Sequence, residues 1–84
     1  MFDPKLIKAF IEQGLDCELV HVDGDGHHFE ALIVSADFAG LSRVKQHQLV
    51  YKTLGDKMGG EIHALSMKTY TPEQWADAKS KRGL

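Results

Sequence analysis

Apolar residues recur every three to four positions near the start of the chain, which is the spacing of an amphipathic helix. They are Leu6, Ile7, Phe10 and Ile11. Asp3 is a suitable N-cap, and Pro4 suits the first helical position because its missing N–H has no intrahelical partner there. Gly14 is suited to end the helix. The pattern therefore predicts a helix over residues 4–13.

Two extended segments follow, separated by a glycine-rich turn. Residues 17–22 read CELVHV, and residues 28–35 form the longest run with strand character. Between them, residues 23–26 read DGDG, and these residue types tolerate the positive φ angles of tight hairpin turns. We expect an antiparallel β-hairpin, and the rest of the chain can be placed relative to it.

The second half of the chain predicts a helix, a strand and a short helix. Ser42 can cap a helix that runs to about Lys57, and residues 61–70 have strand character. The buried stripe expected for this helix is Val44, Val50, Tyr51, Leu54 and Met58. Thr71, followed by proline and by glutamine at the capping-box distance, opens a last helix that Trp75 packs onto the body.

The predicted order is α-β-β-α-β-α, which indicates an α+β fold with helices packed on a three-stranded mixed sheet. Residues 1–84 are too few for two cores and form one domain, whose polar tail at 79–84 is expected to fray. The β-β-α-β core is similar to the K-homology nucleic-acid domain, but the GXXG loop that holds backbone nucleotides is missing.

The topology predicts where the histidines lie. If the second and third strands are parallel neighbours joined by the second helix, their starts lie side by side. His27 and His28 then lie beside His63 at one edge of the sheet. Imidazole is a good ligand for zinc, copper or iron, but this set lacks the four protein ligands of a structural zinc site. A site completed by a second molecule fits better.

A structural reading of the histidines stays open. Taken alone, His63 can be a hydrogen-bonded strand residue, and His21 and His47 have no second ligand near them in sequence. The single cysteine, Cys17, excludes an internal disulfide and fits a small apolar residue at a strand start. The DGDG turn lacks the glutamate that a calcium loop needs at its twelfth position.

Charge and motifs narrow the possible functions. The net charge is −2, which argues against strong non-specific binding to nucleic acid, although a local basic patch remains possible. No catalytic motif or nucleophile–base pair is evident, so we expect no enzyme. No segment has the length of a membrane span or the layout of a signal peptide. We therefore expect a cytoplasmic protein without a membrane anchor, or an organellar one if a presequence has been removed.

Four stretches in order resemble the BolA family, particularly its small IbaG-type bacterial members. They are VDGDGHHFEALIVSADFAG at 22–40, VYKTL in the second helix, IHAL at 62–65 and TPEQW at 71–75. The resemblance covers nearly the whole chain. It implies an α-β-β-α-β fold similar to a class II K-homology domain.

The resemblance also implies a partner and a cofactor. BolA-like proteins pair with monothiol glutaredoxins, and the pair holds a [2Fe-2S] cluster to which the glutaredoxin cysteine and glutathione supply sulfur. Here His63 of the IHAL motif would be one ligand, and His28, or its neighbour His27, the other. No cofactor is expected in the isolated protein, which is expected to be a monomer or a weak homodimer.

A second function implied by the resemblance is transcriptional regulation through DNA. It would depend on a thin basic set: Arg43, Lys45, Lys52 and Lys68. Many relatives carry Arg-His in the second helix where this chain has Gln46 and His47, which weakens the expectation of DNA binding. The basic side of this helix can equally be an ordinary solvated face.

Overall fold

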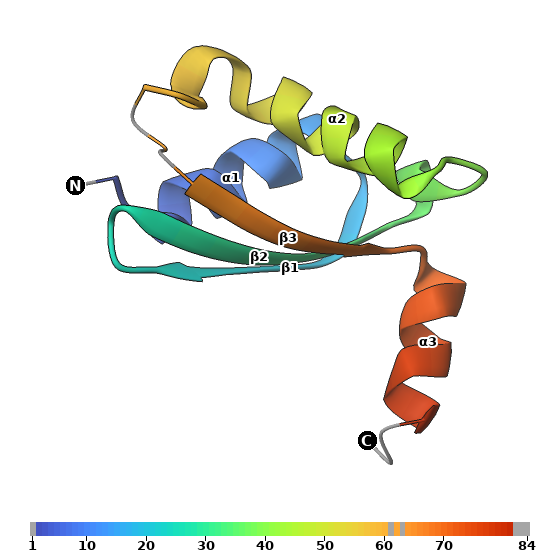
Figure 1. The fold of residues 1–84 in the computed structure, drawn as a ribbon. Helices are drawn as coiled ribbons and strands as arrows, with labels where there is room; N and C mark the ends of the chain where they lie inside the picture. Colours follow the sequence, from blue (N-terminus) through green and yellow to red (C-terminus); the bar gives the residue numbers. More distant parts are fainter. Residues whose placement is uncertain (1, 61, 63, 82–84) are drawn as a thin grey trace.

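Three helices and three strands follow one another in the predicted order (Figure 1). The computed structural model describes residues 2–60, 62 and 64–81. The helices are α1 (Pro4–Gly14), α2 (Arg43–Leu54) and α3 (Pro72–Lys81), and the strands are β1 (Cys17–Gly24), β2 (His28–Ser35) and β3 (Ala64–Tyr70). Short 3-10 turns cover Ala36–Phe38 and Gly55–Lys57.

The sheet is mixed, with β2 at its centre. β1 pairs antiparallel with β2, and β2 pairs parallel with β3, in the order β1-β2-β3. The parallel register joins His28 to Ala64 at one end and Val34 to Tyr70 at the other. The predicted parallel pairing is confirmed, with α2 in the connection between the two strands.

The helices are distributed unequally around the sheet. Figure 1 shows α1 and α2 on one face, while α3 projects from the end of β3 on the other side. α3 has no buried residue among those described, and it meets the sheet through Trp75, whose ring centroid lies 5.4 Å from that of Tyr70. Most of the second sheet face is therefore open, and α3 is an appendage rather than a third layer.

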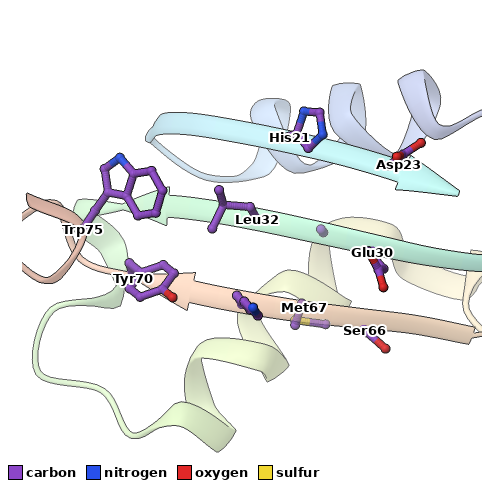
Figure 2. A pocket seen from close by; sticks show the side chains of 10 residues that line it. His21, Asp23, Glu30, Leu32, Ser66, Met67, Tyr70 and Trp75 are labelled. Atoms are coloured by element: carbon purple, nitrogen blue, oxygen red, sulfur yellow. The ribbon is translucent and has the colours of Figure 1, made fainter. Parts of the chain in front are cut away.

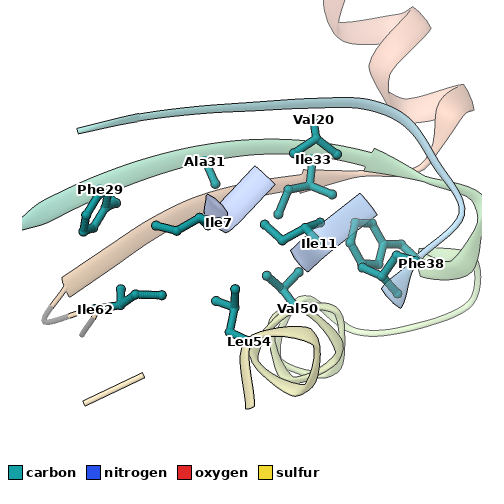
Figure 3. Packing of buried hydrophobic residues seen from close by; sticks show 11 residues of the cluster. Ile7, Ile11, Val20, Phe29, Ala31, Ile33, Phe38, Val50, Leu54 and Ile62 are labelled. Atoms are coloured by element: carbon teal, nitrogen blue, oxygen red, sulfur yellow. The ribbon is translucent and has the colours of Figure 1, made fainter. Parts of the chain in front are cut away.

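The core lies between the sheet and the two covering helices (Figure 3). Ile7 and Ile11 of α1 and Ile33 of β2 are fully buried, as is Phe38 after β2. Each fully buried aliphatic or aromatic side chain of this kind contributes about 1.5–3 kcal/mol by leaving water. Helix α1 therefore buries the isoleucines of its predicted apolar stripe, while Leu6 lies at its edge and is half exposed.

The buried stripe predicted for α2 is wrong at two positions. Val44 is 66% exposed and Tyr51 is 39% exposed, whereas Gln46 is only 5% exposed. At 3.6 residues per turn, the inward face of α2 follows Gln46, Val50 and Leu54 at four-residue spacing. Val44 and Tyr51 are rotated away from this row by about 100°, so their apolar character does not bury them.

Gln46 enters the interior because all its polar atoms find partners there. Its Nε2 donates to the carbonyl oxygens of Phe38 at 3.2 Å and Leu41 at 3.1 Å, and its Oε1 accepts from the Thr69 hydroxyl at 2.7 Å. A buried amide is tolerated only when it is hydrogen-bonded in this way. The glutamine thus links α2 to β3 and to the loop before α2.

The helix starts are confirmed. The Asp3 carboxylate accepts from the N–H of Lys5, and the Ser42 hydroxyl accepts from the N–H of Lys45. At α3, the N–H of Gln74 donates to the Thr71 hydroxyl, and the Thr71 N–H donates to the Gln74 side chain. These side chains satisfy the N–H groups that a helix start leaves unpaired.

Several boundaries differ from the sequence prediction. Helix α2 ends at Leu54 rather than at about Lys57, because residues Gly55–Lys57 form a 3-10 turn, and β1 extends to Gly24 rather than to residue 22. Strand β3 begins at Ala64 rather than at residue 61; Ile62 forms an isolated bridge with Met58, and residues 61 and 63 lie outside the described residues. Helix α3 continues to Lys81, where a fraying tail was expected from residue 79. The Lys81 ammonium lies 3.1 Å from the Asp77 carboxylate one turn earlier.

No helix in the described part of the chain is long and apolar enough to span a membrane.

Gly14 permits the close contact of α1 with α2. A Cβ atom at this position would lie 2.5 Å from Cγ2 of Thr53. We expect Gly14→Ala to destabilise the fold by about 1–2 kcal/mol, because the overpacking cost exceeds the gain in helix propensity. Urea unfolding followed by circular dichroism measures this loss.

The matched control for this variant is Gly14→Ala combined with Thr53→Ser, which removes Cγ2 and keeps the hydroxyl that donates to the Val50 carbonyl. The double variant should recover part of the lost stability, because the Thr53 Cβ, 2.9 Å from the added Cβ, remains. A Gly14→Ala protein as stable as the wild type would show that the contact is not tight.

Candidate metal-ligand site

The hairpin turn positions the two adjacent histidines. β1 ends at Gly24 and β2 begins at His28, and Gly26 between them has a φ of 99°, which favours glycine. The peptide N–H of Asp25 donates to the His28 carbonyl at 3.2 Å. His27 and His28 are both exposed at this end of the sheet.

The Asp25 carboxylate holds the turn in place. Its Oδ1 accepts hydrogen bonds from the backbone N–H groups of both His27 and His28, each at 2.9 Å. These two hydrogen bonds hold the pKa of Asp25 below its ordinary value, because they stabilise the ionised carboxylate. The bond from the His28 N–H has the larger effect. The backbone of the two histidines is thereby fixed by a neighbouring side chain.

The sheet register brings the start of β3 to this turn. His28 pairs directly with Ala64, the residue that follows His63 in the sequence. His63 itself lies outside the described residues, so its role as a ligand remains a prediction. The pairing nevertheless places the chain next to His63 beside the two turn histidines, as the topological argument required.

The described donor groups at this end of the sheet are the two turn histidines and the carboxylates near them. Among the described residues, no group of three or more His, Cys, Asp or Glu side chains is arranged to hold a metal ion. Exposed imidazoles at a sheet edge are suitable nitrogen ligands for iron.

Carboxylates surround the turn histidine. His28 lines a shallow hollow of about 260 Å³ together with Asp23, Asp25 and Glu30. A docking partner that reaches His28 therefore meets a negatively charged rim. Positive charge on the partner would complement this rim.

Cys17 lies in an environment that suppresses thiolate chemistry. The residue is half-buried and packs against the core. Burial, together with the nearby carboxylates of Glu12, Asp37 and Asp16, raises the pKa of Cys17 to about 11. The thiol is thus protonated at neutral pH, whereas a sulfur ligand or nucleophile must be a thiolate.

The open face of the sheet carries a separate hollow (Figure 2). Its volume is about 370 Å³, and His21, Leu32 and Trp75 are among the residues that line it. None of the predicted metal ligands lines this hollow. His21 is exposed on β1 on the same open face, where Asp23 and Glu30 line both this hollow and the one beside His28.

The structure divides the predicted basic set in two. Lys45 and Lys52 point about the same way from α2, on the side opposite to Arg43, because seven residues return almost to the same helical angle. Arg43 instead shares a hollow with Lys68 of β3. The four side chains therefore do not form one continuous nucleic-acid-binding face.

The Gln46 position also bears on the nucleic-acid prediction. Because Gln46 is buried and bonded to Phe38, Leu41 and Thr69, its side chain faces the interior. In this chain the residue acts in packing, and it could not contact a nucleic acid. Sequence patterns missed this role because glutamine is rarely a core residue.

The family model for BolA-like proteins matches residues 11–74, so the chain belongs to the BolA-like family. The resemblance inferred from the four sequence stretches is confirmed. The similarity to K-homology domains stays a prediction.

Individual relatives are similar over almost the whole chain. The acid stress protein IbaG of Escherichia coli K12 is 41% identical over 79 residues, which cover 93% of this chain and 94% of that protein. The DNA-binding transcriptional regulator BolA of Vibrio cholerae is 39% identical over 75 residues, covering 88% and 67%. These names describe a stress protein and a regulator, not enzymes.

A solved structure confirms the fold class. The structure of a BolA protein homologue from Coxiella burnetii superimposes with a TM-score of 0.82 at 44% sequence identity. The match covers 90% of this chain and 99% of that one. The α+β arrangement with a three-stranded mixed sheet is thus the fold of the family.

Replacing the turn carboxylate tests its role. We expect Asp25→Ala to speed hydrogen exchange at the amides of His27 and His28, measured by NMR, because both lose their acceptor. Protonation of Asp25 in acid should likewise lower the protection of these two amides in the wild type, measured as the exchange rate relative to that of an unstructured chain at the same pH. The folded pKa of Asp25 lies below the ordinary 3.8, so its contribution is complete above that value and is lost as the pH falls through the lower one.

Asp23→Ala is the matched control, because the Asp23 carboxylate accepts only from its neighbour Gly24 among the described side-chain hydrogen bonds. This control should leave both histidine amides protected. Equal exchange in the Asp25 variant and the wild type would contradict the proposed role of the carboxylate.

Proposed function

We propose that this protein is a cytoplasmic, non-enzymatic partner of a monothiol glutaredoxin. The two proteins would share a [2Fe-2S] cluster for iron–sulfur trafficking or for sensing iron and redox state. His63 and one of the turn histidines, His28 or His27, would supply nitrogen ligands. The glutaredoxin cysteine and glutathione would supply sulfur, as the family resemblance implies.

The parallel register of β2 and β3 is the observation that carries this proposal. It pairs His28 with Ala64 and so brings two histidine-bearing segments, more than 30 residues apart in sequence, to one sheet edge. The turn histidines are exposed there, within reach of a partner.

Histidine ligation would give such a cluster distinct properties. A cluster with imidazole in place of thiolate has a higher reduction potential, and its binding is sensitive to protons because only neutral imidazole ligates metal. The chain itself contributes the Asp25 carboxylate, which fixes the backbone of both turn histidines. Cys17 is not a candidate ligand, because its thiol stays protonated at neutral pH.

Spectroscopy of the complex tests the proposal. We expect co-expression with a monothiol glutaredoxin to yield a coloured heterodimer, with visible absorption and circular dichroism bands of a [2Fe-2S] cluster. His63→Ala should change or abolish these bands. His28→Ala and His27→Ala, measured in the same way, identify the second ligand as the one whose loss alters the spectrum.

His21→Ala is the control, since it removes an exposed imidazole on the open sheet face. Its complex should have the wild-type spectrum. The absence of any complex or colour under anaerobic conditions with glutathione present would refute the mechanism for this protein.

Binding to DNA is the second candidate, favoured by the name of the Vibrio cholerae relative. The net charge of −2 and the separation of Lys45 and Lys52 from Arg43 weigh against a large phosphate-binding face. A protein that uses many phosphate contacts loses affinity steeply with salt.

A salt titration of duplex binding, followed by fluorescence anisotropy, tests this second function. If it operates, affinity should fall steeply with salt and decrease further in Arg43→Gln and Lys45→Gln. Binding that persists in moderate salt without these side chains would contradict a regulator that grips the DNA backbone through α2.

A further inference from the structure

We propose that the hollow between α2 and the outer edge of β3 binds a phosphate group. Its volume is about 170 Å³, and it is lined by Arg43, His47, Met67, Lys68, Thr69 and Tyr70. A water molecule occupies about 30 Å³ of the liquid, so the hollow has room for a tetrahedral oxyanion and some water. Its lining residues include an arginine, a lysine and a histidine, and no Asp or Glu residue is among them.

The cations of this hollow are not neutralised within the protein. Among the described residues, the one ion pair joins Asp77 and Lys81 on α3. Arg43 and Lys68 come from a helix and a strand and line the hollow together. Lys68 also lines the open-face hollow with Asp23 and Glu30, but it forms no ion pair with them. Guanidinium and ammonium groups held together in this way attract an anion, and guanidinium suits the geometry of phosphate oxygens.

His47 adds an unsatisfied hydrogen-bonding atom. Its Nε2 is buried and has no hydrogen-bond partner among the residues that the structure describes. Buried polar side-chain atoms are usually bonded, so this exception requires an explanation. The charged and titratable groups around it in the hollow are Arg43, Lys68 and Tyr70. An oxyanion there could accept a hydrogen bond from the imidazole and offset the repulsion from the guanidinium.

The edge of the sheet supplies further donors. β3 is an outer strand, paired only with β2, and four consecutive residues, 67–70, line the hollow. Alternate backbone N–H groups of such a strand point away from its neighbour. The start of α2, at Arg43, also lies here with no acidic residue in its first turn. The positive end of the helix dipole thus favours an anion at the same place.

This hollow is distant from the proposed cluster ligands. Tyr70 lies at the opposite end of the parallel ladder from Ala64, six residues away. At about 3.3 Å per strand residue, the two ends are about 20 Å apart. Phosphate binding therefore does not depend on the cluster-sharing function. An experiment that refutes one of the two proposals leaves the other untouched.

The bound group can come from a small phosphate monoester or from a nucleic-acid backbone, which present the same chemistry. Inorganic phosphate is the probe for the shared chemistry. Amide shifts in a ¹H–¹⁵N NMR titration at constant ionic strength, with chloride as the reference anion, measure its binding. We expect saturable shifts at residues 43, 47 and 67–70.

Charge-neutralising variants locate the site. Arg43→Gln and Lys68→Gln should each weaken phosphate binding about tenfold, the effect of losing one charge-assisted hydrogen bond. Lys45→Gln and Lys52→Gln make the same charge change on the far side of α2 and should change affinity less than about twofold. Arg43 and Lys68 are exposed, so these variants should keep the fold, which the unshifted amides elsewhere verify.

The titration of His47 gives a second readout. Burial, followed by the charge of Arg43, holds the pKa of His47 below its ordinary value of 6.5. Phosphate bound beside His47 should raise this pKa, which the imidazole NMR resonances measure. Chloride at the same ionic strength should leave the pKa unchanged. Arg43→Gln should raise the pKa without phosphate and remove the further rise with it.

Adding a short DNA duplex to the phosphate complex distinguishes the sources. Displacement of phosphate from the wild type, together with weaker duplex binding by Arg43→Gln and Lys68→Gln, supports a nucleic-acid backbone as the source. Phosphate that the duplex does not displace supports a small phosphate compound. The site is refuted if the shifts do not saturate beyond the chloride reference. It is equally refuted if Lys45→Gln and Lys52→Gln weaken binding as much as Arg43→Gln and Lys68→Gln.

Discussion

The parallel pairing of β2 with β3 is the constraint on which this fold depends. Parallel neighbours cannot be joined by a tight turn, so the chain must leave the sheet and return through a crossover. Helix α2 occupies that crossover and covers the same face as α1, which creates the enclosed core (Figure 1, Figure 3). The pairing also brings His28 to Ala64, and thus determines which parts of the chain can act together.

One polar residue ties the crossover to the sheet. Gln46 donates to two carbonyl groups before α2 and accepts from Thr69 on β3. Rotation of the helix about its axis would leave these buried groups unpaired, which costs about 1–3 kcal/mol for each group. The same orientation turns Val44 outward and places Arg43 and His47 against the edge of β3. A buried amide therefore influences the chemistry of a surface hollow.

The two ends of the β2–β3 ladder have opposite electrostatic character. At the hairpin end, His28 is surrounded by Asp23, Asp25 and Glu30, while the other end gathers Arg43 and Lys68 without a lining carboxylate. A near-neutral total charge hides this separation. The acidic end suits a basic protein partner, and the basic end suits an anion, so the small domain can present two independent surfaces.

The sequence by itself determined the helices and strands, the helix caps and the hairpin, because these depend on local spacing. The capping side chains of Asp3, Ser42 and Thr71, for example, accept hydrogen bonds from N–H groups no more than three residues away. It also pointed to the edge where His28 lies, because topology rules limit how a helix can join parallel strands. Only the tertiary structure decided that Gln46 is inside, that Val44 is outside, and that the basic side chains separate into two groups. These outcomes depend on the rotation of α2 against β3. Contacts between residues that are distant in sequence determine this rotation, and the spacing of apolar residues alone does not encode it.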